Sequence, residues 1–254
     1  MLLTIDVGNT NLVIGLFEVK ELKQFWRMES SPKKTADEYG AIIRQLFRLD
    51  GYDASDVENI IIASVVPSMN YTIQHICEKY FEKTPVFVNS DMKSGVSIEY
   101  ENPKTLGADR IVNAAAAAAE YEGACIIIDF GTATTFCAVT AERKYLGGVI
   151  APGIKISSDA LFERTSALPK IEITNPQRVI GKNTIECMQS GVLFGNVGAT
   201  EYFVKRMKEE MGENATVIAT GGLSNMVADN TDCIDVIDKL LTLKGLQVIW
   251  ELNS

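Results

Sequence analysis

The stretch LLTIDVGNTN at residues 2–11 decides the fold, because a related stretch, CIIIDFGTAT, occurs again at residues 125–134. In each copy a short apolar run predicts a buried strand, and an aspartate followed two positions later by a glycine marks its end. The two aspartates are Asp6 and Asp129, which are 123 positions apart. A single Asp-x-Gly turn after a strand is common and carries little weight. Two copies, each followed by a β-rich partner, predict an internal duplication.

The elements predicted around the two copies follow the same order, a βββαβαβ unit with a cleft between the copies. In the first half, apolar runs and helical spacing predict strands at 2–7, 12–19, 22–28, 60–66 and 86–88, and helices at 35–49 and 69–81. In the second half they predict strands at 124–128, 134–140, 145–150 and 216–219, helices at 153–163 and 183–211, and a short helix after residue 222. An alanine-rich helix at 111–121 joins the halves.

Length and charge restrict the classes of function. A chain of 254 residues has room for two domains and can bury a core that needs no disulfide or metal. Its 24 basic and 33 acidic residues give a net charge of −9, which disfavours binding to nucleic acid. No run of about 20 apolar residues predicts a membrane span, and the N-terminus lacks the features of a signal peptide.

The cysteines and the histidine predict no metal centre. The five cysteines are odd in number and widely spaced, and mostly lie in apolar runs, which favours reduced thiols in a cytoplasmic protein. There is no CxxC pair, and His75 is the only histidine, so a Cys/His zinc site is not expected.

The segment from Asp6 to Asn11 has the composition of a phosphate-binding turn. Gly8 lets backbone amides approach a phosphate closely, while Thr10 and Asn11 add hydrogen-bond donors. The carboxylate of Asp6 could hold Mg²⁺ beside a nucleotide. The chain has neither a GxxxxGK[ST] loop nor a GxGxxG turn after a strand. The alternative interpretation is a plain hairpin with a solvated aspartate.

A second group of candidate residues is GADR at 107–110, directly before the alanine-rich helix. Asp109 alone could be there for helix electrostatics, and Arg110 alone could be a surface charge. A cation is unfavourable at a helix N-terminus, so Arg110 suggests an anionic partner. Together the pair offers a proton acceptor beside an anion clamp, which phosphoryl transfer to an alcohol requires.

Three glycine motifs are open to two interpretations each. The segment 147–153, GGVIAPG, could shape a pocket wall or simply turn the chain. Gly221-Gly222 could form a nucleotide-binding turn or mark an ordinary one. The third motif is a set of glycines spaced along a predicted helix, Gly191, Gly195 and Gly198. This spacing favours close packing of the helix or a dimer contact over ligand binding.

Five motifs, in this order and at these separations, make the chain resemble the type III pantothenate kinase family. They are IDVGNTN, TLGADR, IDFGTATTF, GGVIAPG and ATGGL, and the likeness spans nearly the whole chain. The resemblance implies an α/β fold of duplicated ribonuclease H-like, actin-like ATPase domains, which we expect at residues 1–110 and 111–254. It also implies ATP-dependent phosphorylation of pantothenate to 4′-phosphopantothenate, the first step of coenzyme A biosynthesis, by a cytoplasmic homodimer that uses Mg²⁺ and K⁺ or NH₄⁺.

The resemblance further implies roles for individual residues. Asp109 would be catalytic, Asp129 would hold the monovalent cation, and Asp6 would contact Mg²⁺ through the nucleotide. The implied ATP-binding residues are Asp6, Val7, Gly8, Asn9, Thr10, Asn11, Leu12, Val13 and Thr132. The implied pantothenate-binding residues are Tyr100, Gly107, Ala108, Asp109, Arg110 and Thr184.

Two other functions remain open at the level of the sequence. The same fold could carry a kinase or phosphatase for another small molecule, because a fold does not fix a substrate. The chain could also act as an accessory factor through protein contacts, since members of the family were called Bvg accessory factor proteins. The presence of all four charged residues, Asp6, Asp109, Arg110 and Asp129, favours an enzyme.

Overall fold

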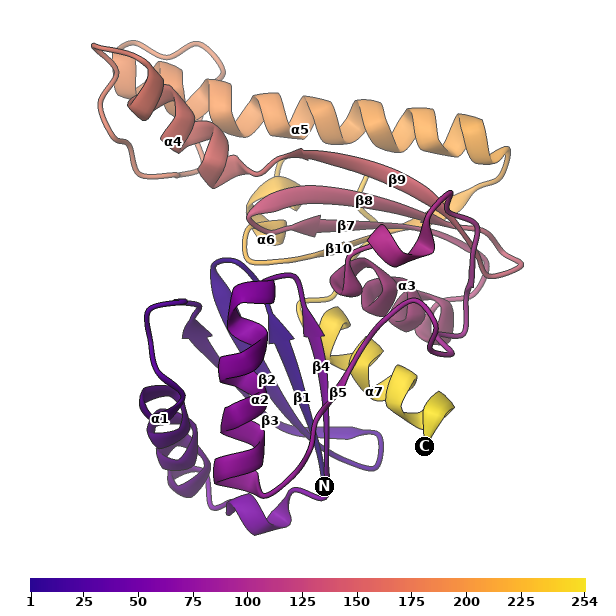
Figure 1. Cartoon of the computed structure of the whole chain (residues 1–254). Helices are drawn as coiled ribbons and strands as arrows, with labels where there is room; N and C mark the ends of the chain where they lie inside the picture. The colour runs from indigo at the N-terminus through magenta and orange to yellow at the C-terminus, as the bar shows by residue number, and fades with distance from the viewer. The chain divides into compact units, whose positions relative to one another are not determined.

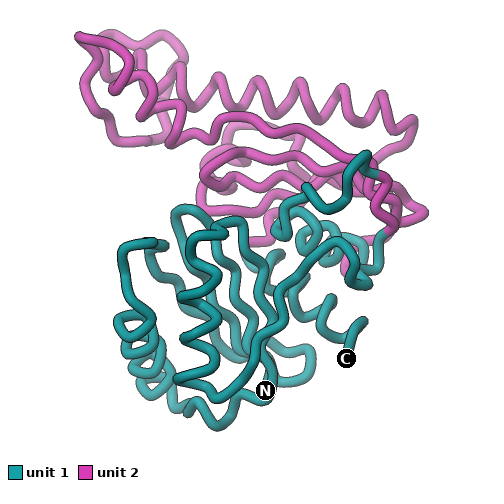
Figure 2. The backbone as a smooth tube through the Cα atoms, in the orientation of Figure 1, with its two compact units in different colours: residues 1–96, 100–119, 240–254 teal, residues 97–99, 120–239 magenta.

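The computed structural model describes all residues from 1 to 254 (Figure 1). The chain forms two compact units (Figure 2). Unit 1 consists of residues 1–96, 100–119 and 240–254, and unit 2 of residues 97–99 and 120–239.

Unit 1 is built on a mixed sheet of five strands in the order β3-β2-β1-β4-β5. The strands are β1 (Leu2–Val7), β2 (Asn11–Glu18), β3 (Glu21–Glu29), β4 (Asn59–Ser64) and β5 (Val86–Phe87). The central strand β1 runs antiparallel to β2 and parallel to β4. The carboxyl ends of β1 and β4 therefore lie at the same edge of the sheet, next to the β1–β2 turn.

Two helices cover one face of this sheet, α1 (Ala36–Leu49) and α2 (Pro67–Phe81). Alternate side chains of β1, beginning with Leu3 and Ile5, share a buried cluster with side chains of both helices. The sequence predicted that Pro67 ends the preceding strand. The structure adds that Pro67 is the first helical residue of α2, where its missing N–H costs no hydrogen bond.

The helices α7 (Leu241–Asn253) and α3 (Ala108–Glu120) complete unit 1, and α7 packs on β1, β2 and β4. The short 3₁₀ helices η1 (Ala54–Asp56) and η2 (Pro103–Thr105) also belong to this unit. The sequence did not predict α7. A central glycine, Gly245, and the β-branched Thr242, Val248 and Ile249 lower its helix propensity, so local composition does not mark it as a helix.

Unit 2 is built on a mixed sheet of six strands in the order β11-β10-β7-β8-β9-β6. The strands are β6 (Ser97–Ile98), β7 (Ala124–Phe130), β8 (Ala133–Val139), β9 (Lys144–Pro152), β10 (Ala215–Thr220) and β11 (Val236–Ile237). The helices are α4 (Ile154–Arg164), α5 (Thr184–Met211) and α6 (Ser224–Ala228). Side chains of β7, β8 and β10 form a buried cluster with residues from all three helices, for example Ile154, Leu193 and Val227.

The predicted duplication is confirmed by the topology of the two sheets. The order β3-β2-β1-β4-β5 in unit 1 matches β9-β8-β7-β10-β11 in unit 2, and β6 adds one parallel strand at the β9 edge. Asp6 stands near the end of β1 as Asp129 stands near the end of β7.

The compact units differ from the predicted ranges in three places, of which the first is that residues 97–99, expected in the first half, lie in unit 2. The boundary expected after residue 110 falls inside α3, and residues 240–254, expected with the second half, lie in unit 1. No local sequence pattern indicates that the C-terminal residues pack on the first unit. The division into 1–110 and 111–254 stays a proposal about the two halves of the duplication.

Candidate active site

The β1–β2 turn of unit 1 is tight and is held from two sides. The amide of Gly8 donates to the carbonyl oxygen of Asn11 at 3.0 Å, and the amide of Ser30 donates to the carbonyl oxygen of Thr10 at 2.9 Å. A Cβ on Gly8 would lie 3.1 Å from the Asn11 oxygen, so a larger residue would crowd the turn. Asn9 and Thr10 are exposed. The turn therefore presents polar groups to ligands on a fixed backbone.

Within the predicted ATP segment, residues differ in what they can offer. The side chains of Val7 and Leu12 are fully buried in the core of unit 1, so only their main chain could approach a phosphate. Asp6, Gly8, Asn11 and Val13 are half-buried. The sequence did not predict that the amide of Ser30 fixes the β1–β2 turn, because a serine after a strand does not indicate which segment its amide contacts.

The first turn of α3 lies at the same edge of the sheet as this β1–β2 turn. A Cβ on Gly107 would lie 3.7 Å from Cγ1 of Val65, the residue that follows β4. The amide of Val65 in turn donates to the carbonyl oxygen of Val7 at 3.1 Å. The structure therefore brings Asp109 and Asp6, which are 103 positions apart in the sequence, to one edge of unit 1.

Asp109 is half-buried, and its Oδ1 accepts a hydrogen bond of 2.8 Å from the amide of Arg110. Desolvation raises the pKa of the Asp109 carboxyl above its ordinary value of 3.8, although this hydrogen bond and the charge of Arg110 oppose the rise. The side chain of Arg110 is buried, with 6% of its surface exposed, so it is not the surface charge that one interpretation of the sequence allowed. Perturbed carboxylates of this kind are typical of functional sites.

Unit 2 has its own polar group at the corresponding turn. Gly221, directly after β10, has φ of 90°, and a Cβ there would lie 2.6 Å from Oδ1 of Asp129. A Cβ on Gly131 would lie 3.5 Å from the same oxygen. Gly153, before α4, packs so closely on the main chain of Thr132 that a Cβ would collide with its carbonyl oxygen. Two motifs that the sequence left open, APG and TGG, therefore enclose the Asp129–Thr132 turn.

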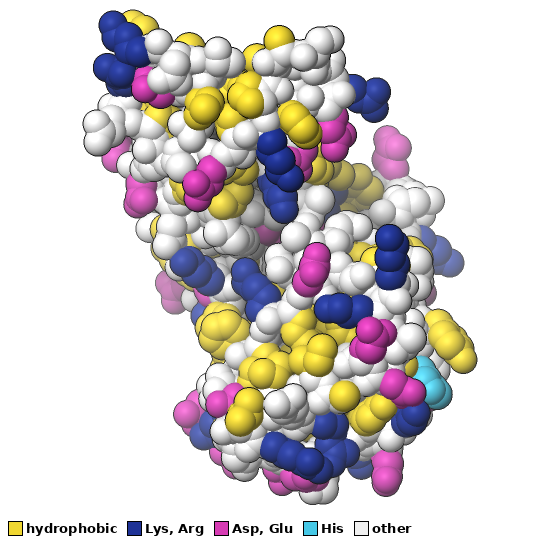
Figure 3. All heavy atoms as spheres, turned by 90° about the vertical axis from the view of Figure 1, so that its left-hand side faces the viewer, with side chains coloured by type: hydrophobic (Ala, Val, Ile, Leu, Met, Phe, Trp, Pro, Cys, Tyr) yellow, Lys and Arg dark blue, Asp and Glu magenta, His cyan; other side chains and the backbone are white.

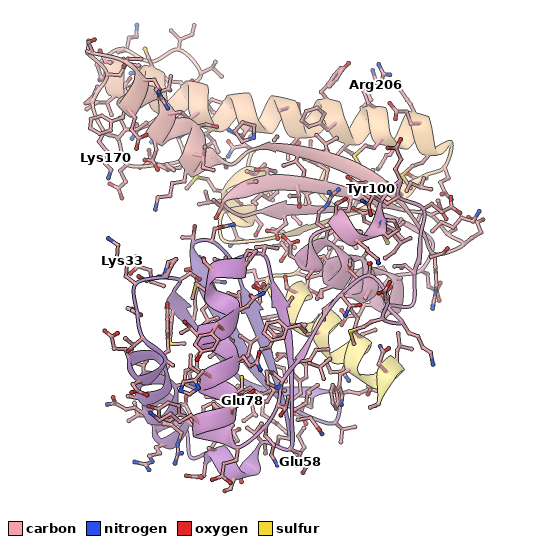
Figure 4. The ribbon with its side chains drawn as sticks, in the orientation of Figure 1. Lys33, Glu58, Glu78, Tyr100, Lys170 and Arg206 are labelled. Atoms are coloured by element: carbon pink, nitrogen blue, oxygen red, sulfur yellow. The ribbon has the colours of Figure 1, made fainter.

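Two predicted substrate residues lie outside these turns. Thr184 is exposed in the first turn of α5, after Asn183, whose Oδ1 accepts from the amide of Glu186 at 2.9 Å. Tyr100 lies between β6 and η2 and is 36% exposed (Figure 4). Ala108 is the first residue of α3, so it lies with Gly107 and Asp109.

The glycines beside Asp129 bring main chain close to its carboxylate. No group of three or more His, Cys, Asp or Glu residues in the structure could hold a metal ion. The Oδ1 of Asp129 lies where side chains on Gly221 and Gly131 would begin, so the carboxylate approaches the main chain of both glycines closely. A single carboxylate beside main chain lacks the compact octahedral set of oxygens that Mg²⁺ requires.

A cavity of about 630 Å³ in unit 1 lies away from these residues. It is found where β1 and β4 begin, at the edge opposite the β1–β2 turn. Its lining includes Leu2, Asn59, Trp250 and Glu58. Figure 4 labels Glu58. None of the predicted site residues lines it.

The other reactive side chains do not form a second centre. Cys77, Cys125 and Cys137 are buried, and burial raises the pKa of the Cys77 thiol to about 12, so it stays protonated. His75 is exposed on α2. On the face shown in Figure 3, acidic and basic side chains are interspersed. No helix combines the length and the apolar character that a membrane span requires.

The strand order and the turns of the two units indicate a broad structural class. Two units with the same strand order, each with an aspartate and a glycine turn after its first strand, are typical of actin-like ATPases and sugar kinases. The sequence profile of the type III pantothenate kinase family matches residues 2–206. The chain belongs to this family, and it is therefore an ATP-binding kinase of coenzyme A biosynthesis, as the resemblance implied.

Solved structures share the fold over nearly the whole chain. A Baf family transcriptional activator from Campylobacter jejuni is 18% identical, with 98% of this chain and 97% of that chain covered and a TM-score of 0.61. A 2-dehydro-3-deoxygalactonokinase from Sinorhizobium meliloti is 10% identical, with coverage of 99% and 96% and a TM-score of 0.58. The ethanolamine utilization protein EutJ from Carboxydothermus hydrogenoformans is 14% identical, with coverage of 97% and 89% and a TM-score of 0.56. At these identities the likeness shows the fold.

Proposed function

We propose that the β1–β2 turn of unit 1 binds the phosphates of ATP and that Asp109 accepts the proton of the pantothenate hydroxyl that is phosphorylated. One observation carries this proposal: α3 begins beside Val65, at the edge of the sheet where the β1–β2 turn lies. A phosphate-binding turn and a proton acceptor at one edge are what phosphoryl transfer to an alcohol requires.

The proton acceptor works by position and by charge. As the hydroxyl oxygen forms a bond to the terminal phosphorus of ATP, the bond from that phosphorus to the bridging oxygen breaks and ADP leaves. The O–H bond of the hydroxyl also breaks, and the proton goes to the Asp109 carboxylate. Partial burial makes Asp109 a stronger base than an exposed aspartate, which assists this transfer. The neighbouring guanidinium of Arg110 is suited to an anionic group of the substrate, for which the carboxylate of pantothenate is the candidate.

The remaining implied contacts divide between the two units. In unit 1, residues 6–13 would hold the nucleotide, and Tyr100, Gly107 and Ala108 would line the pantothenate site. In unit 2, Thr132 would contact ATP and Thr184 would contact pantothenate.

Two cations complete the proposal. Asp6 would contact the Mg²⁺ that accompanies ATP, and Asp129 would hold K⁺ or NH₄⁺ with help from the oxygens of residues 130–132. When bound, these cations neutralise negative charge on the phosphates and on the two carboxylates. The close approach of Gly221 and Gly131 keeps main-chain groups beside the Asp129 carboxylate, which supports the second assignment.

We also propose a cytoplasmic homodimer. Gly191, Gly195 and Gly198 are exposed on α5, and a Cβ on any of them would meet nothing within 4 Å in this chain. Exposed apolar side chains lie nearby in sequence, including Ile180 at 77% and Ile185 at 48%. A self-complementary contact about a two-fold axis is the commonest way to cover such a surface. The five free cysteines are compatible with a reducing compartment.

The test is ADP release by the purified protein with ATP, Mg²⁺ and pantothenate, in KCl, NaCl or NH₄Cl at constant ionic strength. We expect release that depends on pantothenate and is faster with K⁺ or NH₄⁺ than with Na⁺. An Asp129→Asn variant should lose the difference between the salts. Absence of pantothenate-dependent release contradicts the reaction, whereas equal rates in the three salts contradict only the assignment of Asp129.

A further inference from the structure

The last helix of the chain, α7, packs directly on α3 (Figure 1). Gly245 meets the main chain of Val112 so closely that a Cβ would collide with the Val112 carbonyl oxygen and lie 2.7 Å from its carbonyl carbon. The obstacle is backbone, which cannot move aside as a flexible side chain can. Only glycine therefore permits this approach of the two helices.

A partly buried hydrogen bond lies beside this contact. The hydroxyl of Thr242 donates to Oδ1 of Asn113 at 2.8 Å, and the side chain of Asn113 is 2% exposed. Asn113 follows Asp109 by four positions, so the two residues lie on the same side of α3, one turn apart. Both contacts with α7 therefore act within one turn of Asp109.

The same helix is anchored on the sheet. The side chain of Leu243 lies 3.0 Å from where a Cβ on Gly15 of β2 would be, and Gln247 donates to the carbonyl oxygen of Val19 at 3.3 Å. Near the end of α7, Asn253 donates to the carbonyl oxygen of Lys93 at 2.8 Å. α7 thus connects α3 to the sheet whose edge carries the β1–β2 turn.

We propose that α7, through Gly245 and Thr242, is a positioning element for the reaction, which fixes the first turn of α3 at the edge where the β1–β2 turn lies. The inference rests on the proposed role of Asp109. Without the contact at Val112, the first turn of α3 would be held by the other buried side chains of the helix and by the approach of Gly107 to Val65. A displacement of about 1 Å at a reacting group is enough to lower a rate ~100-fold.

The experiment compares Gly245→Ala with Gly40→Ala, a control in the same unit. Gly40 is a buried glycine of α1, and a Cβ there would collide with the ring of Tyr80 on α2, away from α3. We expect Gly245→Ala to lower kcat by roughly 10- to 100-fold, with the KM for ATP changed by less than about 2-fold. Gly40→Ala should lower the melting temperature while kcat stays within about 2-fold of the parent.

A second pair tests the hydrogen bond with a smaller change. Thr242→Val removes the hydroxyl and keeps the shape, and Thr242→Ser restores the hydroxyl. We expect Thr242→Val to lower kcat by about 3- to 10-fold and Thr242→Ser to recover most of it. This pair decides the question if Gly245→Ala does not fold.

The outcomes separate the two proposals. If Gly245→Ala or Thr242→Val folds and turns over like the parent while Asp109→Asn is inactive, the positioning role is wrong and the role of Asp109 stands. If Gly40→Ala loses as much kcat as Gly245→Ala, the loss reflects stability and the positioning role is again wrong. If Asp109→Asn is fully active, the proposed function itself fails.

Discussion

Burial of the Asp109 carboxyl raises its pKa, which suits the proposed proton acceptor but lowers the stability of the fold at neutral pH. Its carboxylate is half-buried, and it has the main-chain N–H of Arg110 and the neighbouring guanidinium as its favourable partners. Because desolvation raises the pKa above its unfolded value, the folded state binds the proton more tightly than the unfolded state does. Folding stability therefore falls as the pH rises from the ordinary value of 3.8 through the raised value. At neutral pH the ionised carboxylate destabilises the fold.

Replacing this side chain should separate activity from stability. We expect Asp109→Asn to lower kcat by about 10²–10⁴-fold, because the variant lacks the proposed proton acceptor. The melting temperature at neutral pH should rise, because no charge is buried and the amide oxygen can still accept from Arg110. Asp91→Asn, at an exposed position, is the control and should change neither quantity. A folded Asp109→Asn protein with parent-like turnover would rule out the catalytic role.

The pH dependence of kcat offers an independent check. Activity should fall as the pH drops through the raised pKa of Asp109, because a protonated carboxyl cannot accept the proton. The midpoint of this acid limb should lie above 3.8. The phosphates of ATP also titrate, so the comparison is with the residual activity of Asp109→Asn. The acid limb should be missing there, and its persistence would assign the titration to another group.

Gly221 lies directly against the carboxylate of Asp129, because it has no Cβ to keep that side chain away. We expect Gly221→Ala to reduce activity and the response to K⁺, because a Cβ would crowd the Asp129 carboxylate. Gly212→Ala is a matched control, since Gly212 has a similar φ of 70° but open space around it. Both variants are strained in the backbone, by roughly 1–2 kcal/mol. If both behave alike in the KCl, NaCl and NH₄Cl assay, the contact with Asp129 has no part in cation binding.

At the level of elements, each half of the chain begins with a hairpin whose turn carries the candidate residues. The strands make the turn predictable, because a buried strand ends where polar residues and glycine begin. The supports of the turns come from elsewhere in each unit, from Ser30 in unit 1 and from Gly153 and Gly221 in unit 2. The local sequence therefore predicts where such a hairpin turns, but not the residues that hold the turn in place.

Helix α1 shows the opposite case, in which local sequence specifies the element fully. Thr35 accepts from the amide of Glu38 at 3.3 Å, and Glu38 accepts from the amide of Thr35 at 2.7 Å. We expect Thr35→Ala to cost about 1 kcal/mol and to lower the melting temperature by roughly 2–4 °C, with kcat unchanged. Thr35→Ser should keep the parent's melting temperature. An unchanged melting temperature in Thr35→Ala would mean that the capping box contributes nothing.

At the level of the whole molecule, the glycine surface of α5 predicts an assembly. Sedimentation of the parent should give two copies of the 27.8 kDa chain. Gly195→Glu should weaken the dimer by at least about 10-fold, because a charge would be buried in a close contact. Arg206→Ala, exposed on the same helix, is the control. A parent protein that is monomeric and fully active at assay concentration would contradict the dimer.

Much of the fold could be read from the sequence because its signals are local. The apolar runs before Asp6 and Asp129, the glycines after them and the helical spacing in α1 and α2 each lie within a few turns of chain. They predicted the five strands of unit 1, four of the six strands of unit 2 and the duplication, whereas the two-residue strands β6 and β11 were not predicted. The resemblance of five short motifs also predicted the family, which the match over residues 2–206 confirms.

The tertiary structure alone decided which of these local signals come together. The residues that fix α3, Gly245 and Thr242, lie more than 120 positions from their partners Val112 and Asn113. A helix glycine looks locally like a defect, and its use appears only when the backbone that it admits is known. The burial of Arg110 was hidden for the same reason. Desolvation and close packing depend on segments that are far apart in the chain, so no pattern along the sequence records them.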